Sequence, residues 1–171
     1  YRLQIGSSAS KATRKLENIL MANFKPTTLK WDEHQPGYHQ KAFHLVLNRY
    51  DRNDGMDPHQ DFSTTYHEQN PITSLSYGRG SILTITDSNK PTKQRTALYY
   101  QFPGDAIIMS GDFNLKFWHG VPAVDSWQAL FNRQNIVRML PKNEFDEANR
   151  VIDGGEMNER FNVTIRWHES H

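Results

Sequence analysis

The chain has 171 residues, enough for one domain that buries a core of its own. It contains no cysteine, which excludes disulfides, thiolate metal sites and a cysteine nucleophile. No apolar run approaches the roughly 20 residues that span a bilayer. We therefore expect no membrane segment and an intracellular protein, in the cytoplasm or the nucleus.

The net charge of +1 is unevenly distributed along the chain. Residues 1–50 carry eight Lys and Arg against three Asp and Glu, an excess of +5, which leaves −4 for the remaining residues. A basic N-terminal third could attract a polyanion such as a nucleic acid. A solvated basic helix face explains the same charge without any partner, so the charge leaves both interpretations open.

The residue pattern of positions 1–42 differs from that of the rest of the chain and predicts a separate N-terminal unit. Within it, residues 11–22 (KATRKLENILMA) have the apolar spacing of an amphipathic helix, and residues 25–41 are polar and rich in turn-forming residues. Binding residues often lie on exposed loops of this kind. We therefore assign residues 1–42 to a helix followed by a substrate-recognition segment.

From residue 43 onward the chain consists of short β-type runs separated by Gly, Pro and Asn, which favour turns. The predicted strands are 43–50, 72–78, 81–87, 96–102, 105–110, 114–120 and 160–167. Seven or eight short strands with tight turns are typical of an antiparallel sandwich or jelly roll. We predict a mainly β (α+β) fold: a jelly-roll core over 43–171 with flanking helices and an insert at about 121–158, as a single domain overall.

A His-x-Asp pair, His59 and Asp61, follows the turn-forming run RNDG. The chain has eight histidines, and His119 stands out because strand parity places it on one face with Leu115 and Phe117. Two histidines and one carboxylate can hold Fe(II) and leave three coordination positions open. Hydrogen bonding within a loop, and a histidine satisfied in the core, are the competing explanations.

The last predicted strand alternates apolar and polar residues. Its polar face consists of Arg160, Asn162, Thr164 and Arg166. An inward-facing guanidinium is costly unless an anion meets it, and its planar fork suits a carboxylate. In the first predicted strand, Asn48 and Tyr50 share a face and can orient a carboxylate without adding charge. These residues favour a dicarboxylate ligand, whereas an edge strand with its arginines in water remains the alternative.

Taken in order, these motifs resemble the AlkB-like Fe(II)/2-oxoglutarate-dependent dioxygenases. The resemblance covers about residues 43–167 and rests on Asn-x-Tyr, His-x-Asp, SLSYG, GDAIIMSG, the distal His-Gly and RFNVTIR. It implies a double-stranded β-helix in which Fe(II) is ligated by His59, Asp61 and His119. It further implies that 2-oxoglutarate is bound by Asn48, Tyr50, Arg160, Asn162 and Arg166, with one arginine pairing with the distal carboxylate.

The resemblance also implies a reaction. Fe(II), 2-oxoglutarate and O2 would together hydroxylate a substrate C–H bond and release succinate and CO2. The typical substrate is an N-alkylated base in DNA or RNA, flipped out of any duplex, whose hydroxylated alkyl group leaves as an aldehyde. Such oxidative demethylation serves DNA repair or nucleic-acid modification. The candidate substrate contacts are Trp31, Tyr38 and Ser63, the last of which stands where many nucleic-acid-repairing relatives carry an acidic residue.

Two other functions fit parts of the same pattern. The iron chemistry could act on a protein side chain or a small metabolite instead of a base. A non-catalytic β-sandwich that binds a ligand would carry its histidines by chance, and it would neither bind iron nor form succinate.

Overall fold

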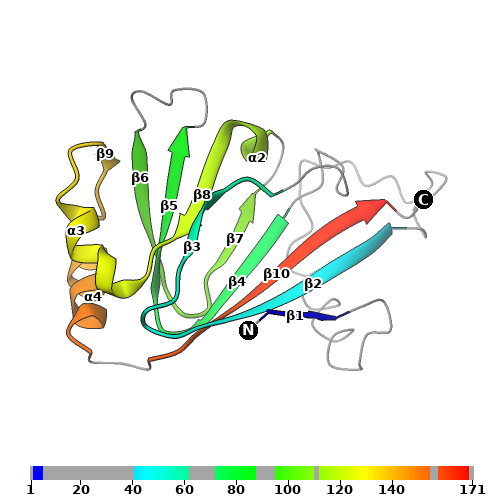
Figure 1. Ribbon diagram of the computed structural model, residues 1–171, viewed down its shortest axis with the longest axis horizontal. Helices are drawn as coiled ribbons and strands as arrows, with labels where there is room; N and C mark the ends of the chain where they lie inside the picture. Colours follow the sequence, from blue (N-terminus) through cyan, green and yellow to red (C-terminus); the bar gives the residue numbers. More distant parts are fainter. Residues whose placement is uncertain are drawn as a thin grey trace.

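The computed structural model describes residues 2–5, 41–61, 72–87, 95–109, 112–154 and 158–169 (Figure 1). The predicted helix at 11–22 and most of the predicted loop at 25–41 lie outside these residues, and so do Trp31, Tyr38 and Ser63. Within the described part of the chain, no helix has the length and hydrophobicity needed to cross a membrane.

Two five-stranded sheets form the body of the molecule (Figure 1). Sheet I has the order β1-β2-β10-β4-β7, with β1 Arg2–Ile5, β2 Lys41–Tyr50, β10 Arg160–Glu169, β4 Ile72–Gly78 and β7 Ala106–Met109. Sheet II has the order β3-β8-β5-β6-β9, with β3 Met56–His59, β8 Phe117–Val121, β5 Ser81–Asp87, β6 Thr96–Gln101 and β9 Ile136–Arg138. All pairs are antiparallel except β6 and β9, which run parallel.

The order of the strands is that of a jelly roll. From β2 to β10 the chain moves repeatedly between the two sheets, so that each sheet is built from strands distant in sequence. The last strand, β10, lies between β2 and β4 and pairs with both along most of its length. This confirms the predicted mainly β fold with a double-stranded β-helix core.

One predicted strand, 114–120, is wrong in its first half. Residues Phe113–Lys116 form a one-turn helix, α2, and β8 begins only at Phe117. The turn closes because the amides of Leu115 and Lys116 both donate to the Asp112 carbonyl, and the Lys116 ammonium pairs with the Asp112 carboxylate. Leu115 is therefore 46% exposed and does not continue the inward row of Phe117 and His119.

Within the predicted 121–158 insert, residues 122–152 form a cap on sheet II. It contains a 3-10 turn (Val124–Ser126), the helices α3 (Trp127–Phe131) and α4 (Lys142–Ile152), and β9. The 3-10 turn and the two helices pack against one face of β5 and β6, and β9 pairs with β6 at the edge of the sheet (Figure 1). The resulting hydrophobic core contains Ile82, Leu98, Tyr100, Val124, Trp127, Leu130, Phe131, Leu140, Ala148 and Val151. This apolar core lies on the face of sheet II that carries Ile82, whereas the neighbouring residue Leu83 lines the space between the two sheets.

The cap is expected to contribute much of the stability of the fold. Trp127 is 0% exposed, and its indole Nε1 donates to the Pro122 carbonyl at 3.0 Å. Trp127→Ala should lower the free energy of unfolding by about 3–5 kcal/mol, the usual effect of truncating a buried aromatic residue. Urea denaturation measures this loss. Met139→Ala, at a side chain that is 45% exposed, should stay within about 0.5 kcal/mol of the wild type; equal stability of the two variants would contradict the assigned core.

Candidate metal centre

A cavity of about 560 Å³ lies between the two sheets. Alternate residues of β2 and β10 form one wall, and β3, β5 and β8 contribute to the other. From the last strand the lining residues are Arg160, Asn162, Thr164 and Arg166, the four that period-two alternation predicts on one face. From the first, Asn48 and Tyr50 line the cavity together with Val46. The predicted polar face is thus the inward face of sheet I.

Three side chains at one end of the cavity have the composition of a metal site. Antiparallel pairing of β3 with β8 places His59 directly opposite His119, and their ring centroids lie 4.4 Å apart. The Asp61 carboxylate completes the group: its Oδ1 is 3.7 Å from His59 Nε2 and its Oδ2 is 4.0 Å from His119 Nε2. One ligand atom from each residue lies within 4.8 Å of the other two, so a single ion can be bound by all three.

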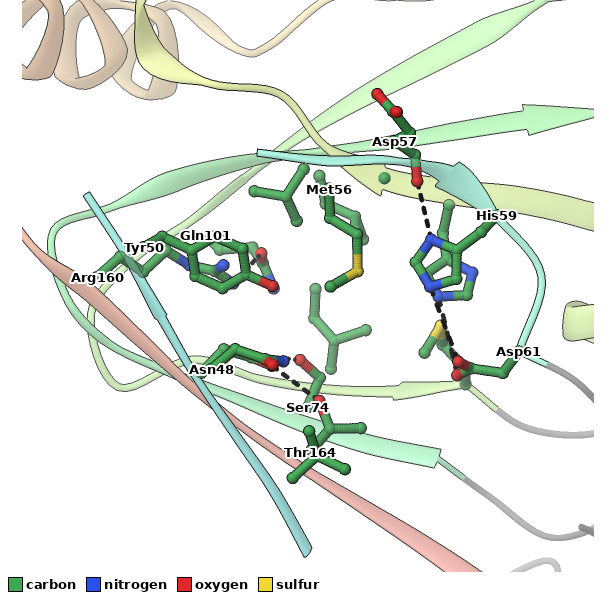
Figure 2. A pocket seen from close by; sticks show the side chains of 18 of the residues that line it. Asn48, Tyr50, Met56, Asp57, His59, Asp61, Ser74, Gln101, Arg160 and Thr164 are labelled. Carbon is green, nitrogen blue, oxygen red and sulfur yellow. Dashed lines mark hydrogen bonds and ion pairs between the residues drawn. The ribbon is translucent and has the colours of Figure 1, made fainter. Parts of the chain in front are cut away.

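The imidazoles of His59 and His119 can each offer a nitrogen lone pair to a metal ion. His59 Nδ1 lies 2.9 Å from the Asp57 carbonyl oxygen (Figure 2). In the neutral ring, an oxygen acceptor at that distance favours the tautomer with its proton on Nδ1, in which Nε2 carries the lone pair and faces Asp61. Burial, and then the neighbouring His59, lower the pKa of His119 to about 4. His119 is therefore neutral near pH 7, the form in which a histidine ligates a metal.

The carboxylate of Asp61 has a partner on the other sheet. Arg166 Nη2 donates to Asp61 Oδ1 at 2.5 Å, and both side chains are largely buried. This contact places Arg166 at the metal end of the cavity and gives the buried carboxylate a compensating charge.

The opposite end of the cavity contains a buried cation. Arg160 is 2% exposed; its Nη2 donates to Ser76 Oγ at 2.9 Å and to Gln101 Oε1 at 3.2 Å. The Tyr50 ring lies beside the guanidinium, with Cζ 5.1 Å from the ring centroid. Figure 2 shows Tyr50, Gln101 and Arg160 grouped at one end and His59 and Asp61 at the other.

The buried guanidinium of Arg160 favours an anionic ligand in the cavity. Within the described structure, its Nε and Nη1 have no hydrogen-bond acceptor. Burial lowers the pKa of Arg160 to about 10, with Tyr50 opposing the shift, so the guanidinium is still cationic near pH 7. A buried cation with two donor nitrogens that lack an acceptor is costly, and a carboxylate in the cavity would supply both the charge and the acceptors. The cavity therefore fits a metal at one end and a carboxylate at the other.

The polar wall between the two ends is largely fixed by its own hydrogen bonds. Asn162 Nδ2 donates to Ser74 Oγ at 2.7 Å and to the Leu75 carbonyl at 3.0 Å, while its Oδ1 accepts from Thr164 Oγ1 at 2.8 Å. Asn162 thus braces the cavity wall, whereas Asn48 lines the cavity beside it.

Two features of the site were missed by the sequence interpretation. Gln101 ends β6, accepts from both Ser81 Oγ and Arg160, and lines the cavity. Its only signal in the sequence is a polar residue at the end of an apolar strand, which is too common to be informative. The Asp57 carbonyl, which orients His59, carries no side-chain signal at all.

Comparisons with known proteins agree with this chemistry. The family model of the 2OG-Fe(II) oxygenase superfamily matches residues 6–166. Uncharacterized protein L905 of Acanthamoeba polyphaga mimivirus is 32% identical over 83 residues, which cover 48% of this chain and 38% of the viral protein. The matched part is thus well under two thirds of that relative's length.

Two solved structures are among the matches to this chain. OsALKBH1 is 20% identical with a TM-score of 0.46, and the match covers 92% of this chain and 60% of that one. A Pseudomonas putida prolyl-4-hydroxylase is 11% identical with a TM-score of 0.48, covering 99% and 72%. The superfamily match confirms the predicted iron and 2-oxoglutarate chemistry class, with O2 as the oxidant that an oxygenase requires. Because the family model spans nearly the whole sequence, the chain belongs to the 2OG-Fe(II) oxygenase superfamily.

Proposed function

We propose that the protein is an Fe(II)- and 2-oxoglutarate-dependent dioxygenase that hydroxylates, and thereby removes, N-alkyl groups on bases of DNA or RNA. His59, Asp61 and His119 would hold the iron, and Arg160 would bind the distal carboxylate of 2-oxoglutarate. The observation that supports the iron and 2-oxoglutarate part of this proposal is the presence of both features in one cavity: three candidate metal-ligand atoms within 4.8 Å, and a buried guanidinium with donor nitrogens that lack an acceptor.

Each side chain would have a distinct task. Arg160 would pair bidentately with the distal carboxylate, with Tyr50 and Gln101 closing that end of the cavity. Asn48 would contact the co-substrate from the β2 wall, and Asn162 would keep the wall in place through Ser74. Arg166 would hold the Asp61 carboxylate in its orientation toward the iron, beside the metal-end portion of the co-substrate.

The overall reaction balances with one molecule of each co-substrate. When bound, Fe(II) supplies the redox chemistry that couples O2 to the oxidation of both substrates. One oxygen atom enters succinate as 2-oxoglutarate loses CO2, and the other enters the substrate C–H bond as a hydroxyl group. A hydroxyl on the carbon attached to a base nitrogen makes that C–N bond labile: the hydroxyl loses its proton as the C=O bond of the aldehyde forms, the C–N bond breaks, and the nitrogen keeps the electron pair and takes up a proton.

Support for a nucleic-acid substrate comes from two properties of the sequence. The ordered set of motifs resembles AlkB-like enzymes, and the first 50 residues carry an excess of five positive charges. Trp31, Tyr38 and Ser63 stay the candidate contacts to a flipped base, whose aromatic faces favour stacking on Trp and Tyr.

The substrate assignment is tested by product analysis. Purified protein with Fe(II), ascorbate and 2-oxoglutarate should form succinate several-fold faster with an N-methylated oligonucleotide than with the same sequence unmethylated. Mass spectrometry should show loss of the methyl group. A panel of single-stranded and duplex DNA and RNA identifies the preferred polymer, and a peptide pool serves as the competing substrate. Hydroxylation of a peptide, with no change in any methylated oligonucleotide, would replace the base with a protein side chain.

A further inference from the structure

Asp61, one of the three candidate metal ligands, has no partner in the β3–β8 ladder. Strand β3 ends at His59, and its ladder with β8 pairs only Met56 with Val121 and His59 with His119. Asp61 stands two residues beyond that strand end, yet it is 8% exposed and lies beside both histidines. Some other contact must fix its backbone.

That contact is made by the side chain of Asn114. Asn114 Oδ1 accepts a hydrogen bond from the Asp61 amide at 2.7 Å, and its Nδ2 donates to the Asp61 carbonyl at 2.5 Å. A side-chain amide thus makes with Asp61 the same pair of bonds that a facing residue makes in an antiparallel ladder. The neighbouring Gln60 adds a third bond, from its Nε2 to the Leu115 carbonyl at 2.9 Å.

The location of Asn114 links this contact to the rest of the site. Asn114 lies on α2, which runs directly into β8 and therefore into His119. The ring centroids of Phe113 and Phe117 lie 5.3 Å apart, so a side-chain contact packs the helix against the strand. The continuous α2–β8 segment thus carries His119, one candidate metal ligand, and holds the backbone of Asp61, another.

We propose that Asn114 is a positioning residue that sets the distance between the Asp61 carboxylate and the two histidines; this inference rests on the proposed metal role of those three residues. Arg166 fixes the carboxylate from sheet I, and Asn114 fixes the backbone from the α2–β8 segment. Asn114 is not among the residues that line the cavity, so its effect is exerted through Asp61.

The test measures Mn(II) binding by the metal-free full chain, with Mn(II) as an oxygen-stable probe for Fe(II). Asn114→Leu keeps the approximate size of the side chain and removes both hydrogen bonds, and Asn114→Ala removes the bulk as well. Both variants should bind Mn(II) about 10–100-fold more weakly, as when other groups that orient a metal ligand are lost. At saturating metal, their KM for 2-oxoglutarate should stay close to that of the wild type, because the Arg160 end is untouched.

A matched control separates positioning from general destabilisation. Thr86→Val removes a buried hydrogen bond to Thr96 Oγ1 (3.0 Å) on sheet II, away from the cavity. It should lower the unfolding midpoint and leave the Mn(II) affinity unchanged. If Thr86→Val weakens Mn(II) binding as much as Asn114→Leu does, the assigned role of Asn114 is overturned.

The outcomes also separate this inference from the proposed metal site. If wild type binds Mn(II), and His119→Ala abolishes binding while Asn114→Leu leaves it unchanged, the positioning role alone is wrong. If wild type does not bind Mn(II), or His119→Ala binds it normally, the metal site itself is wrong. Should one Asn114 variant fail to fold, the affinity of the other decides the question.

Discussion

His119→Ala is expected to eliminate succinate formation. His119 supplies one of three ligand atoms grouped within 4.8 Å, and it is buried beside the other two. Losing a group that merely orients a ligand costs about 10–100-fold in metal affinity or activity, so losing the ligand itself should cost more than about a hundredfold. Anaerobic Fe(II) titration and a succinate assay on the same preparation measure both effects.

The adjacent residue provides the control for this variant. Trp118 precedes His119 on β8, is 43% exposed and points to the opposite face of the strand. Trp118→Ala should bind Fe(II) with the affinity of the wild type. An active, iron-binding His119→Ala protein would reject the assigned metal centre.

The second large effect is expected at the other end of the cavity. Arg160→Met keeps an unbranched apolar side chain but removes the buried guanidinium. Losing one partner of a desolvated ion pair costs about 2–5 kcal/mol, and each 1.4 kcal/mol is about tenfold. The KM for 2-oxoglutarate should therefore rise by roughly a hundredfold, while Mn(II) affinity without the co-substrate stays unchanged.

Arg166 provides the contrast within the same strand. Its guanidinium already donates to Asp61, so Arg166→Met should weaken Mn(II) binding in the absence of 2-oxoglutarate, which Arg160→Met should not do. The assignment of the two arginines fails if the effects are exchanged, or if Arg160→Met leaves the KM for 2-oxoglutarate within about twofold of the wild type.

The alternation of side chains along the strands predicted several of the residues that line the site. Alternation in β10 placed Arg160 and Arg166 on one face, and both line the cavity. The polar residues of β2, Asn48 and Tyr50, lie there as well. Such predictions succeed because a sheet with one enclosed face fixes the direction of every second side chain.

The sequence could not distinguish the two arginines. Arg160 and Arg166 share the same face, but only the three-dimensional structure shows that Arg166 contacts Asp61 and Arg160 contacts Gln101. Contacts between residues 59 or 105 positions apart depend on tertiary placement and leave no local pattern.

The errors of the sequence interpretation have local causes. The run 114–120 has strand-like composition, yet Asp112 and Lys116 close a helical turn over its first half. Strand β3 was not predicted because it is short and contains Pro58, which cannot donate to a ladder. Both errors lie next to the candidate metal ligands. There, Asn114 holds the backbone of Asp61, and the pairing of β3 with β8 places His59 opposite His119.

The most direct measurement is a crystal structure of the protein grown without O2 in the presence of Mn(II) and 2-oxoglutarate. We expect one ion bonded to His59 Nε2, the Asp61 carboxylate and His119, with the distal carboxylate of 2-oxoglutarate paired to Nε and Nη1 of Arg160. An ion bound elsewhere, or a distal carboxylate turned away from Arg160, would contradict the assignment.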